Sequence, residues 1–205
     1  MSDDINTTDT TGTDDLAALD QISLDFAAIC AQALPVLHSP LPAPSLPGQL
    51  EPANAPAVLA SIDQAVALTQ AGTCRALVTN PINRAALYAA GFRFPGHTEY
   101  LGHLAGLDHP TVIMLACEAL RVVPVTLHVS LSDAIKQLDA ATLAHACRTT
   151  HAYLRDHLGI ARPRLAVSGL NPHAGEAGAM GREELEWIAP LIAELQSPDM
   201  TLTGP

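Results

Sequence analysis

Positive charge is missing from the first third of the sequence. No Lys or Arg precedes Arg75, whereas nine of the 21 acidic residues do, and the net charge of the chain is −11. From Arg75 onward acids and bases nearly balance, so the acidity belongs mainly to the N-terminal segment. A nucleic-acid groove needs clustered Lys and Arg. The charge pattern therefore argues against a nucleic-acid partner.

Closely spaced cysteines and long apolar runs are also absent. Cys30, Cys74, Cys117 and Cys147 lie far apart and form no C-x-x-C pair, so neither a zinc ribbon nor a redox motif is indicated. No apolar run approaches 18 residues, and the N-terminus lacks a basic region followed by an apolar core. We therefore expect a cytoplasmic protein with free thiols and no membrane partner.

Aromatic residues make up only 3% of the chain, although 48% of it is hydrophobic, which favours an aliphatic core of helices against a sheet. Residues 1–15 are polar and acidic and predict disorder. Residues 16–34 have helical spacing, and a proline-rich stretch follows that is typical of an extended connection. Residues 1–47 are thus expected to form an acidic head, a helix and a linker, ahead of a folded region over 48–205.

Within the folded region, helical and strand patterns alternate. The predicted helices cover 55–72, 81–91, 98–106, a long stretch through about 158, and 183–195. The predicted strands cover 75–79, 111–116, 121–129 and 163–170. Alternating strands and helices of this length indicate a layered α/β sheet covered by helices.

The stretch "SGLNPHAGEAGAMGREE" over 168–184 joins the last predicted strand to the last predicted helix. It is rich in glycine and places His173 between a proline and an alanine-glycine pair. Loops in this position commonly carry the chemistry of α/β proteins. His128 interrupts an apolar run near the end of an earlier predicted strand.

These two histidines are candidate metal ligands. If their strands are parallel neighbours, both imidazoles emerge at one sheet edge, with ring nitrogens within about 5 Å for a shared zinc or related divalent ion. The alternative for His128 is a core histidine bonded to a backbone carbonyl. Glu176 is a weak candidate for a third ligand, because the glycines beside it leave its direction undefined.

Two further stretches favour anion binding. In "VTNPINR" a helix predicted to begin at Pro81 would direct free backbone N–H groups at a phosphate or carboxylate, although Thr79 or Asn80 could simply be its N-cap. In "PGHTEY" His97 and Thr98 precede another helix and could hydrogen-bond an anionic substrate, together with the first helix start. The alternative for His97 is an ordinary surface histidine.

Three stretches carry a more specific signal: "ALVTNPINRAALYAAGFRFPGHTEYLGHLAG", "VIMLACEALRVVPVTLHVSL" and "PRLAVSGLNPHAGEAGAMGREELEWIAPLIAEL". Together they resemble the 4-hydroxythreonine-4-phosphate dehydrogenase family of pyridoxal phosphate biosynthesis, and the resemblance covers roughly 48–205. It implies a fold similar to isocitrate and isopropylmalate dehydrogenases, with two α/β domains and a homodimer whose active site draws on both subunits.

By this resemblance, His128 in "T-x-H" and His173 in "L-N-P-H-A-G-E" correspond to ligands of a divalent metal (Zn, Mg or Co). His97 and Thr98 in "G-H-T-E" correspond to residues that contact the substrate, a phosphorylated hydroxy amino acid. The implied reaction uses NAD or NADP to oxidise 4-hydroxythreonine 4-phosphate, with decarboxylation, to 3-amino-2-oxopropyl phosphate. No cofactor-binding or catalytic residue is assigned.

The chain also departs from the family pattern. Residues 1–47 are expected to have no counterpart, and the chain ends before the "Y-H-D-Q-G" motif with the third metal histidine and most nicotinamide contacts. Arg84 replaces a usual lysine, which keeps the charge but not the geometry. Two hypotheses follow: a portion or short form of the enzyme, or a non-catalytic remnant with an anion pocket. Related dehydrogenases of phosphorylated threonate or erythronate, or of cyclic dihydrodiols, share these motifs.

Overall fold

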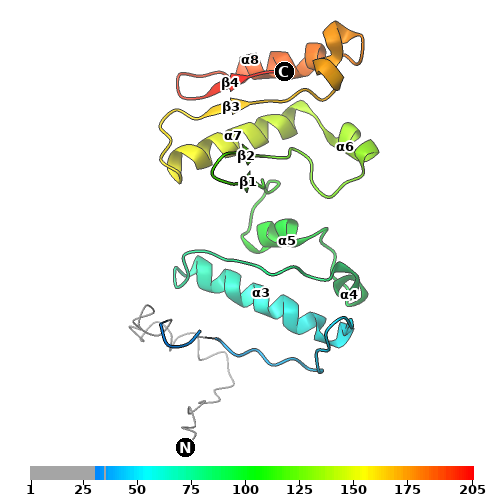
Figure 1. Ribbon diagram of the computed structural model, residues 1–205, viewed down its shortest axis with the longest axis vertical. Helices are drawn as coiled ribbons and strands as arrows, with labels where there is room; N and C mark the ends of the chain where they lie inside the picture. The colour runs from blue at the N-terminus through cyan, green and yellow to red at the C-terminus, as the bar shows by residue number, and fades with distance from the viewer. Residues whose placement is uncertain (1–30, 35) are drawn as a thin grey trace, which may run out of the picture. The chain divides into compact units, whose positions relative to one another are not determined.

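The computed structural model describes residues 31–34 and 36–205 (Figure 1). The predicted disordered segment over 1–15 and most of the predicted helix over 16–34 lie outside the described residues. The chain divides into two compact units, the first ending at Arg93 and the second spanning Phe94–Pro205. The domain boundary predicted between residues 47 and 48 stays a prediction.

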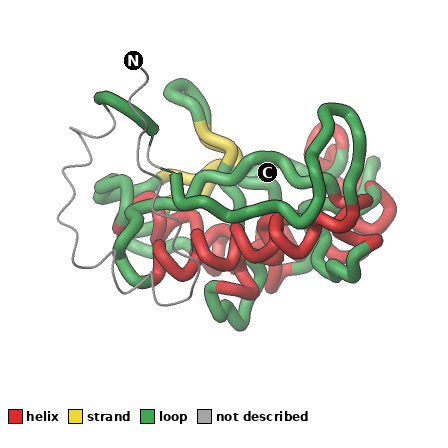
Figure 2. The backbone as a smooth tube through the Cα atoms, turned by 90° about the horizontal axis from the view of Figure 1, so that it is seen from below, coloured by secondary structure: helices red, strands yellow, loops and turns green. Residues whose placement is uncertain are grey.

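Helices and short strands follow one another along the described chain. The first unit contains η1 (Pro52–Asn54), α3 (Ala55–Gln70) and α4 (Arg84–Ala89). The second contains α5 (His97–Leu104), β1 (Leu115–Ala116), β2 (Arg121–Val122), α6 (Leu131–Gln137), α7 (Ala140–Asp156), β3 (Arg164–Ala166), η2 (Pro172–Gly178), η3 (Glu184–Ile188), α8 (Ala189–Leu195) and β4 (Thr201–Thr203). The fold is therefore α/β, with helices and two small sheets. Figure 2 shows how much of the backbone is helix and loop.

The first unit is organised around α3, which was predicted over 55–72. A proline in its first turn fits the missing N–H at that position, and Ile62 and Val66 are buried along one face. Asn54, directly before the helix, donates from its side-chain amide to the carbonyl of Ala43 and accepts from the Ala43 N–H, both at 2.9 Å. This pair of bonds fastens the proline-rich stretch to the start of α3.

The segment after α3 differs from the sequence prediction in two ways. The helix predicted from Pro81 begins instead at Arg84, because Asn83 accepts a hydrogen bond from the Ala86 N–H at 3.1 Å and caps it. The strand predicted over 75–79 does not form, and Val78 is 92% exposed. A strand needs a neighbour for its backbone groups, and the described residues give this segment none.

The second unit contains two separate strand pairs. β1 and β2 are antiparallel, with Leu115 opposite Val122, whereas β3 and β4 are parallel, with Leu165 opposite Leu202. The chain between β3 and β4 passes through η3 and α8, as a parallel connection requires. The predicted strands over 111–116, 121–129 and 163–170 are thus shortened. In the second of these, Pro124 lacks the N–H that a strand ladder needs.

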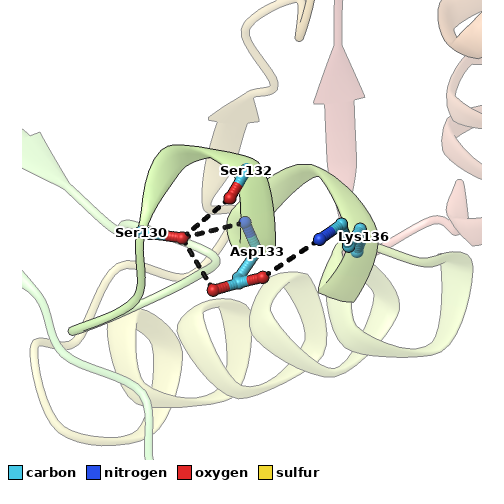
Figure 3. A network of polar contacts seen from close by, with 4 residues as sticks. All are labelled: Ser130, Ser132, Asp133 and Lys136. Carbon is cyan, nitrogen blue, oxygen red and sulfur yellow. Dashed lines mark hydrogen bonds and ion pairs between the residues drawn. The ribbon is translucent and has the colours of Figure 1, made fainter.

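The long helix predicted to end near residue 158 is divided into α6 and α7. Ser130 caps α6 by accepting from the Asp133 N–H at 3.2 Å, and its hydroxyl donates to the Asp133 carboxylate, which also pairs with Lys136 (Figure 3). Asp139 caps α7 by accepting from the Thr142 N–H at 2.8 Å. Two N-cap residues, Ser130 and Asp139, therefore start two helices where the spacing of apolar residues alone predicts one.

The core of the second unit lies where α7, η3 and α8 meet the parallel strand pair. Its buried members are Leu143, Ala144, Cys147, Ile188, Leu191, Ile192, Leu195, Met200 and Leu202. Figure 1 shows α8 running alongside β4, which it contacts. Among the described residues, no helix combines the length and the hydropathy that crossing a bilayer requires.

Truncation of this core tests its placement. Ile188 is 2% exposed, whereas Leu185 on the same helical segment is 51% exposed. We expect Ile188→Ala to lower the free energy of unfolding by about 2–5 kcal/mol, because it leaves a cavity in a packed core. Leu185→Ala is the matched control and should lie within about 0.5 kcal/mol of wild type. Urea unfolding followed by circular dichroism measures both, and equal effects would contradict the assigned core.

Candidate functional site

The start of α5 carries two of the residues predicted to bind substrate. The helix begins at His97, one residue earlier than predicted, and Thr98 and Glu99 complete its first turn. Gly96 precedes it and supplies no side-chain cap, so the first N–H groups of α5 have no capping acceptor there. Helix starts of this kind favour anionic groups.

His128 lies against this helix start. Its Nδ1 is 3.2 Å from Oε1 of Glu99, and the two side chains are 30% and 28% exposed. Gly96 makes the approach possible, since a Cβ at that position would lie 3.3 Å from Cε1 of the His128 ring. The alternative for His128 was a core histidine bonded to a backbone carbonyl. In the structure, the partner of Nδ1 is instead the side chain of Glu99. A neutral imidazole that donates from Nδ1 to a carboxylate keeps its lone pair on Nε2.

Two buried polar atoms beside this pair have no hydrogen-bond partner among the described residues. They are Nε2 of His97 and Oε2 of Glu99. Buried polar atoms are nearly always paired, so these two can bond a water, an ion or another group that the described residues do not supply. The structure thus places His128 against Glu99, in the turn of α5 that His97 begins. Sequence reasoning missed Glu99 as a partner of His128 because 29 residues separate them.

His173 lies in η2 and is exposed. It begins a run of six residues with positive φ, from His173 at 54° through Gly178 at 92°. Such a conformation costs about 1–2 kcal/mol per residue that carries a Cβ. His128 also has a positive φ, of 56°. Both predicted metal ligands therefore occupy a left-handed backbone, and strain of this kind gathers at functional sites.

The loop that holds His173 is anchored by carboxylates at the start of η3. The backbone N–H of Asn171 donates to Oε1 of Glu184 at 2.7 Å, and its side-chain amide donates to Oε2 of Glu184 at 2.9 Å and to Glu183 at 2.7 Å. Glu184 is only 4% exposed. The hydrogen bonds from the side chain and then the backbone of Asn171 lower the pKa of Glu184 below its ordinary value of 4.5.

The segments that lead to the two histidines face one cavity of about 900 Å³. Residues 120–126 line part of it and residues 162–170 line another part. The strands in these segments, β2 and β3, belong to different sheets, so the condition that the two strands are parallel neighbours is not met. Convergence of the two imidazoles stays a prediction. Within residues 31–34 and 36–205, no group of three His, Cys, Asp or Glu side chains could hold a metal.

The helix start that was predicted to bind an anion near Pro81 lies at Arg84 instead. Thr79 and Asn80 are exposed and precede α4 without capping it, because Asn83 does so. The interpretation of Thr79 or Asn80 as the N-cap is therefore wrong. Arg84, the residue that replaces a family lysine, is the first residue of α4 and is exposed. Glu176, the weak third ligand candidate, is exposed in the left-handed run.

The Glu99–His128 contact predicts a fixed imidazole tautomer. At alkaline pH, where imidazole is neutral, nitrogen-15 NMR should show His128 protonated at Nδ1 in the wild type. Glu99→Ala removes the acceptor and should give a mixture of tautomers. Glu118→Ala, an exposed glutamate of the same unit, is the control and should leave the His128 signals unchanged. Identical His128 spectra for Glu99→Ala and wild type would contradict the contact.

Comparisons with known proteins agree with the motifs. The model of the family described as pyridoxal phosphate biosynthetic protein PdxA matches residues 4–205. The expectation that residues 1–47 have no family counterpart is therefore wrong. Two proteins named 4-hydroxythreonine-4-phosphate dehydrogenase are similar: that of Paracoccus denitrificans, 52% identical over 84% of this chain and 55% of its own length, and that of Bradyrhizobium diazoefficiens, 50% identical over 88% and 53%.

Solved structures give the same result. The 4-hydroxythreonine-4-phosphate dehydrogenase of Klebsiella pneumoniae is 36% identical, with a TM-score of 0.70 over 78% of this chain and 47% of its own. A terephthalate 1,2-cis-dihydrodiol dehydrogenase of Burkholderia xenovorans is 32% identical, with a TM-score of 0.56 over 80% and 53%. The chain spans about half the length of the curated relatives it matches. On this evidence, the chain belongs to the PdxA family.

Proposed function

We propose that this chain forms part of a metal- and nicotinamide-dependent dehydrogenase that converts 4-hydroxythreonine 4-phosphate to 3-amino-2-oxopropyl phosphate. The observation that carries the proposal is the family membership, together with relatives named for this activity at about half identity. The proposal includes the layered fold of isocitrate and isopropylmalate dehydrogenases, a homodimer and a cytoplasmic location. The family resemblance implies these three properties for the complete enzyme, and this chain spans about half the length of the curated relatives it matches.

His128 and His173 are the residues that would hold the divalent ion, zinc, magnesium or cobalt. Imidazole nitrogens suit such ions, and the Glu99 contact leaves Nε2 of His128 available for one. A carboxylate on the far ring nitrogen is the usual support of a metal-binding histidine. Two imidazoles do not complete a catalytic site, so a further ligand from outside the described residues is part of the proposal. When bound, the ion would lower the pKa of the substrate alcohol and stabilise a developing enolate.

His97 and Thr98 are proposed to bind the anionic end of the substrate. Nε2 of His97 is buried without a partner among the described residues, and the uncapped N–H groups of α5 lie in the same turn. In the reaction, the alcohol carbon loses a hydride to NAD or NADP and the hydroxyl loses a proton. The resulting 3-oxo acid releases carbon dioxide, and the carbon that lost it takes up a proton. Residues that bind the nicotinamide are not assigned.

A second candidate is a related dehydrogenase of another hydroxylated substrate. The structural similarity to the terephthalate dihydrodiol dehydrogenase favours it, at 32% identity. Phosphorylated threonate or erythronate are further substrates of this kind. The start of α5 suits all of these substrates, because a helix N-terminus binds a carboxylate as well as a phosphate. A non-catalytic remnant that keeps this anion pocket is the alternative outside enzymes.

Metal binding tests the ligand assignment. In isothermal titration with zinc, we expect His128→Ala and His173→Ala each to weaken binding at least about tenfold, because each removes a direct ligand. His157→Ala, an exposed histidine of the same unit, is the control and should bind as wild type does. Unchanged zinc affinity in both ligand variants would contradict the assignment.

Turnover tests how much of the enzyme this chain provides. With 4-hydroxythreonine 4-phosphate, NAD and zinc, magnesium or manganese, we expect residues 1–205 alone to produce no reduced nicotinamide. The reason is that two imidazoles hold a metal weakly and no G-x-G-x-x-G stretch follows a strand. Absorbance of reduced nicotinamide is the measurement, with a full-length relative as positive control. Turnover near that of the control would show that the chain is catalytically sufficient.

A further inference from the structure

The loop that carries His173 adopts a backbone that its own sequence does not favour. Four of the six residues in the left-handed run carry a Cβ: His173, Ala174, Glu176 and Ala177. The other two, Gly175 and Gly178, suit the conformation intrinsically. At the ends of the loop, the Ala174 N–H donates to the Asn171 carbonyl, and the N–H groups of Ala179 and Met180 donate to the carbonyls of Glu176 and Gly175. A backbone that most of its residue types disfavour persists when contacts around it stabilise it.

Glu184 meets this requirement through Asn171. Its two carboxylate oxygens accept from the backbone and the side-chain amide of Asn171, at 2.7 and 2.9 Å. The carboxylate is nearly fully buried, and Asn171 lies two residues before His173. We name the Asn171–Glu184 contact the loop clamp. Hydrogen bonds to a buried ionised group are among the strongest that a side chain makes.

Two glycines allow the loop clamp to close. A Cβ at Gly175 would lie 2.8 Å from Oε2 of Glu184, and a Cβ at Gly181 would overlap the amide of Asn171. Neither position has room for a larger residue without moving the clamp. Contact with the clamp, as well as backbone conformation, thus explains why Gly175 and Gly181 are glycines.

The clamp is also attached to the rigid part of the unit. Glu184 begins η3, a π-helical turn that ends at Ile188, and Ile188 is 2% exposed in the core with Leu191 and Ile192. Single π-helical turns frequently occur at functional sites. A side chain fixed at the end of a packed helix can hold a loop more accurately than another loop residue can.

We propose that Glu184, acting through Asn171, is a positioning residue that presents His173 to the metal. The proposal rests on the proposed function, because it takes His173 as a metal ligand. Glu184 itself does not need to touch the ion. Its removal would let the loop relax from the left-handed conformation, so that His173 no longer has one direction.

Zinc titration of the 205-residue chain tests this role. We expect Glu184→Gln to weaken zinc binding about 10- to 100-fold, the range found when supports of metal ligands are removed. The new amide would present a donor where Asn171 already offers one. Glu186→Gln is the matched control, since Glu186 lies on the same helical turn but is 58% exposed and pairs only with Arg182. It should bind zinc as wild type does.

A milder variant covers the case in which Glu184→Gln does not fold. Asn171→Ala removes the side-chain bonds but leaves the backbone N–H for Glu184 to accept, so zinc binding should weaken less, by about tenfold. Amide NMR supplies a readout independent of zinc. Signals of 171–178 should shift and broaden in both variants, while those of the core residues Ile188 and Leu202 stay in place.

The outcomes separate the two proposals. If His173→Ala weakens zinc binding but Glu184→Gln and Asn171→Ala do not, the positioning role is wrong and the proposed function stands. If His173→Ala leaves zinc binding unchanged, the metal role of His173 fails and the positioning role fails with it. Weaker binding in His173→Ala and both clamp variants, with Glu186→Gln unchanged, supports the proposal.

Discussion

The hydrogen bonds between Asn171 and Glu184 connect the packed part of the second unit to its most strained loop. On one side, Glu184 belongs to the helical turn that buries Ile188 against α7. On the other, Asn171 leads into a run of left-handed residues, four of which carry a Cβ that disfavours this conformation. The burial of apolar side chains in the core thus supplies the stability that keeps His173 in place. Without this connection the loop would be an ordinary glycine-rich surface segment.

His128 is held by a different device with the same result. Its backbone is also left-handed, and its ring is fixed by Glu99 from the first turn of α5. The same turn presents His97 and the uncapped N–H groups. The proposed metal ligand His128 and the proposed anion-binding site therefore meet at the start of α5. In the proposed enzyme, the start of α5 would bind the phosphate end of the substrate and His128 would hold the metal at the reacting alcohol. Both ends of the substrate would then lie in one site.

Local sequence patterns predicted the helices better than the strands. The spacing of apolar residues, together with proline and glycine at helix ends, predicted the bounds of α3, α5 and the stretch over η3 and α8 to within a few residues. Helices are predicted in this way because their hydrogen bonds are local. Strands depend on partners elsewhere in the chain, so the segment 75–79 and most of 121–129 are not strands in the structure. The start of α4 was misplaced because Asn83, rather than Pro81, decides where that helix begins.

The site residues were identified from motifs, but their supports were not. His97, Thr98, His128 and His173 stand out by type and position, and the family resemblance gives them roles. Glu99 and Glu184 carry no comparable signal, because in the sequence each is only a glutamate near the start of a helix. Their roles become apparent when the structure places His128 against Glu99 and Asn171 against Glu184. Residue preferences also do not predict a left-handed backbone at residues other than glycine, such as His128 and His173. Contacts over such sequence distances are set by packing, which one sequence does not specify.

In the proposed site, His128 and His173 bind one divalent ion through their imidazoles. X-ray absorption at the zinc edge, on the zinc-loaded 205-residue chain, tests this most directly because it counts histidine ligands by the scattering of their rings. The account predicts two imidazoles with light oxygen or nitrogen atoms completing the shell at about 2.0–2.2 Å, and one imidazole after His173→Ala. A zinc shell without imidazole scattering, or one that His173→Ala and His128→Ala leave unchanged, would contradict it.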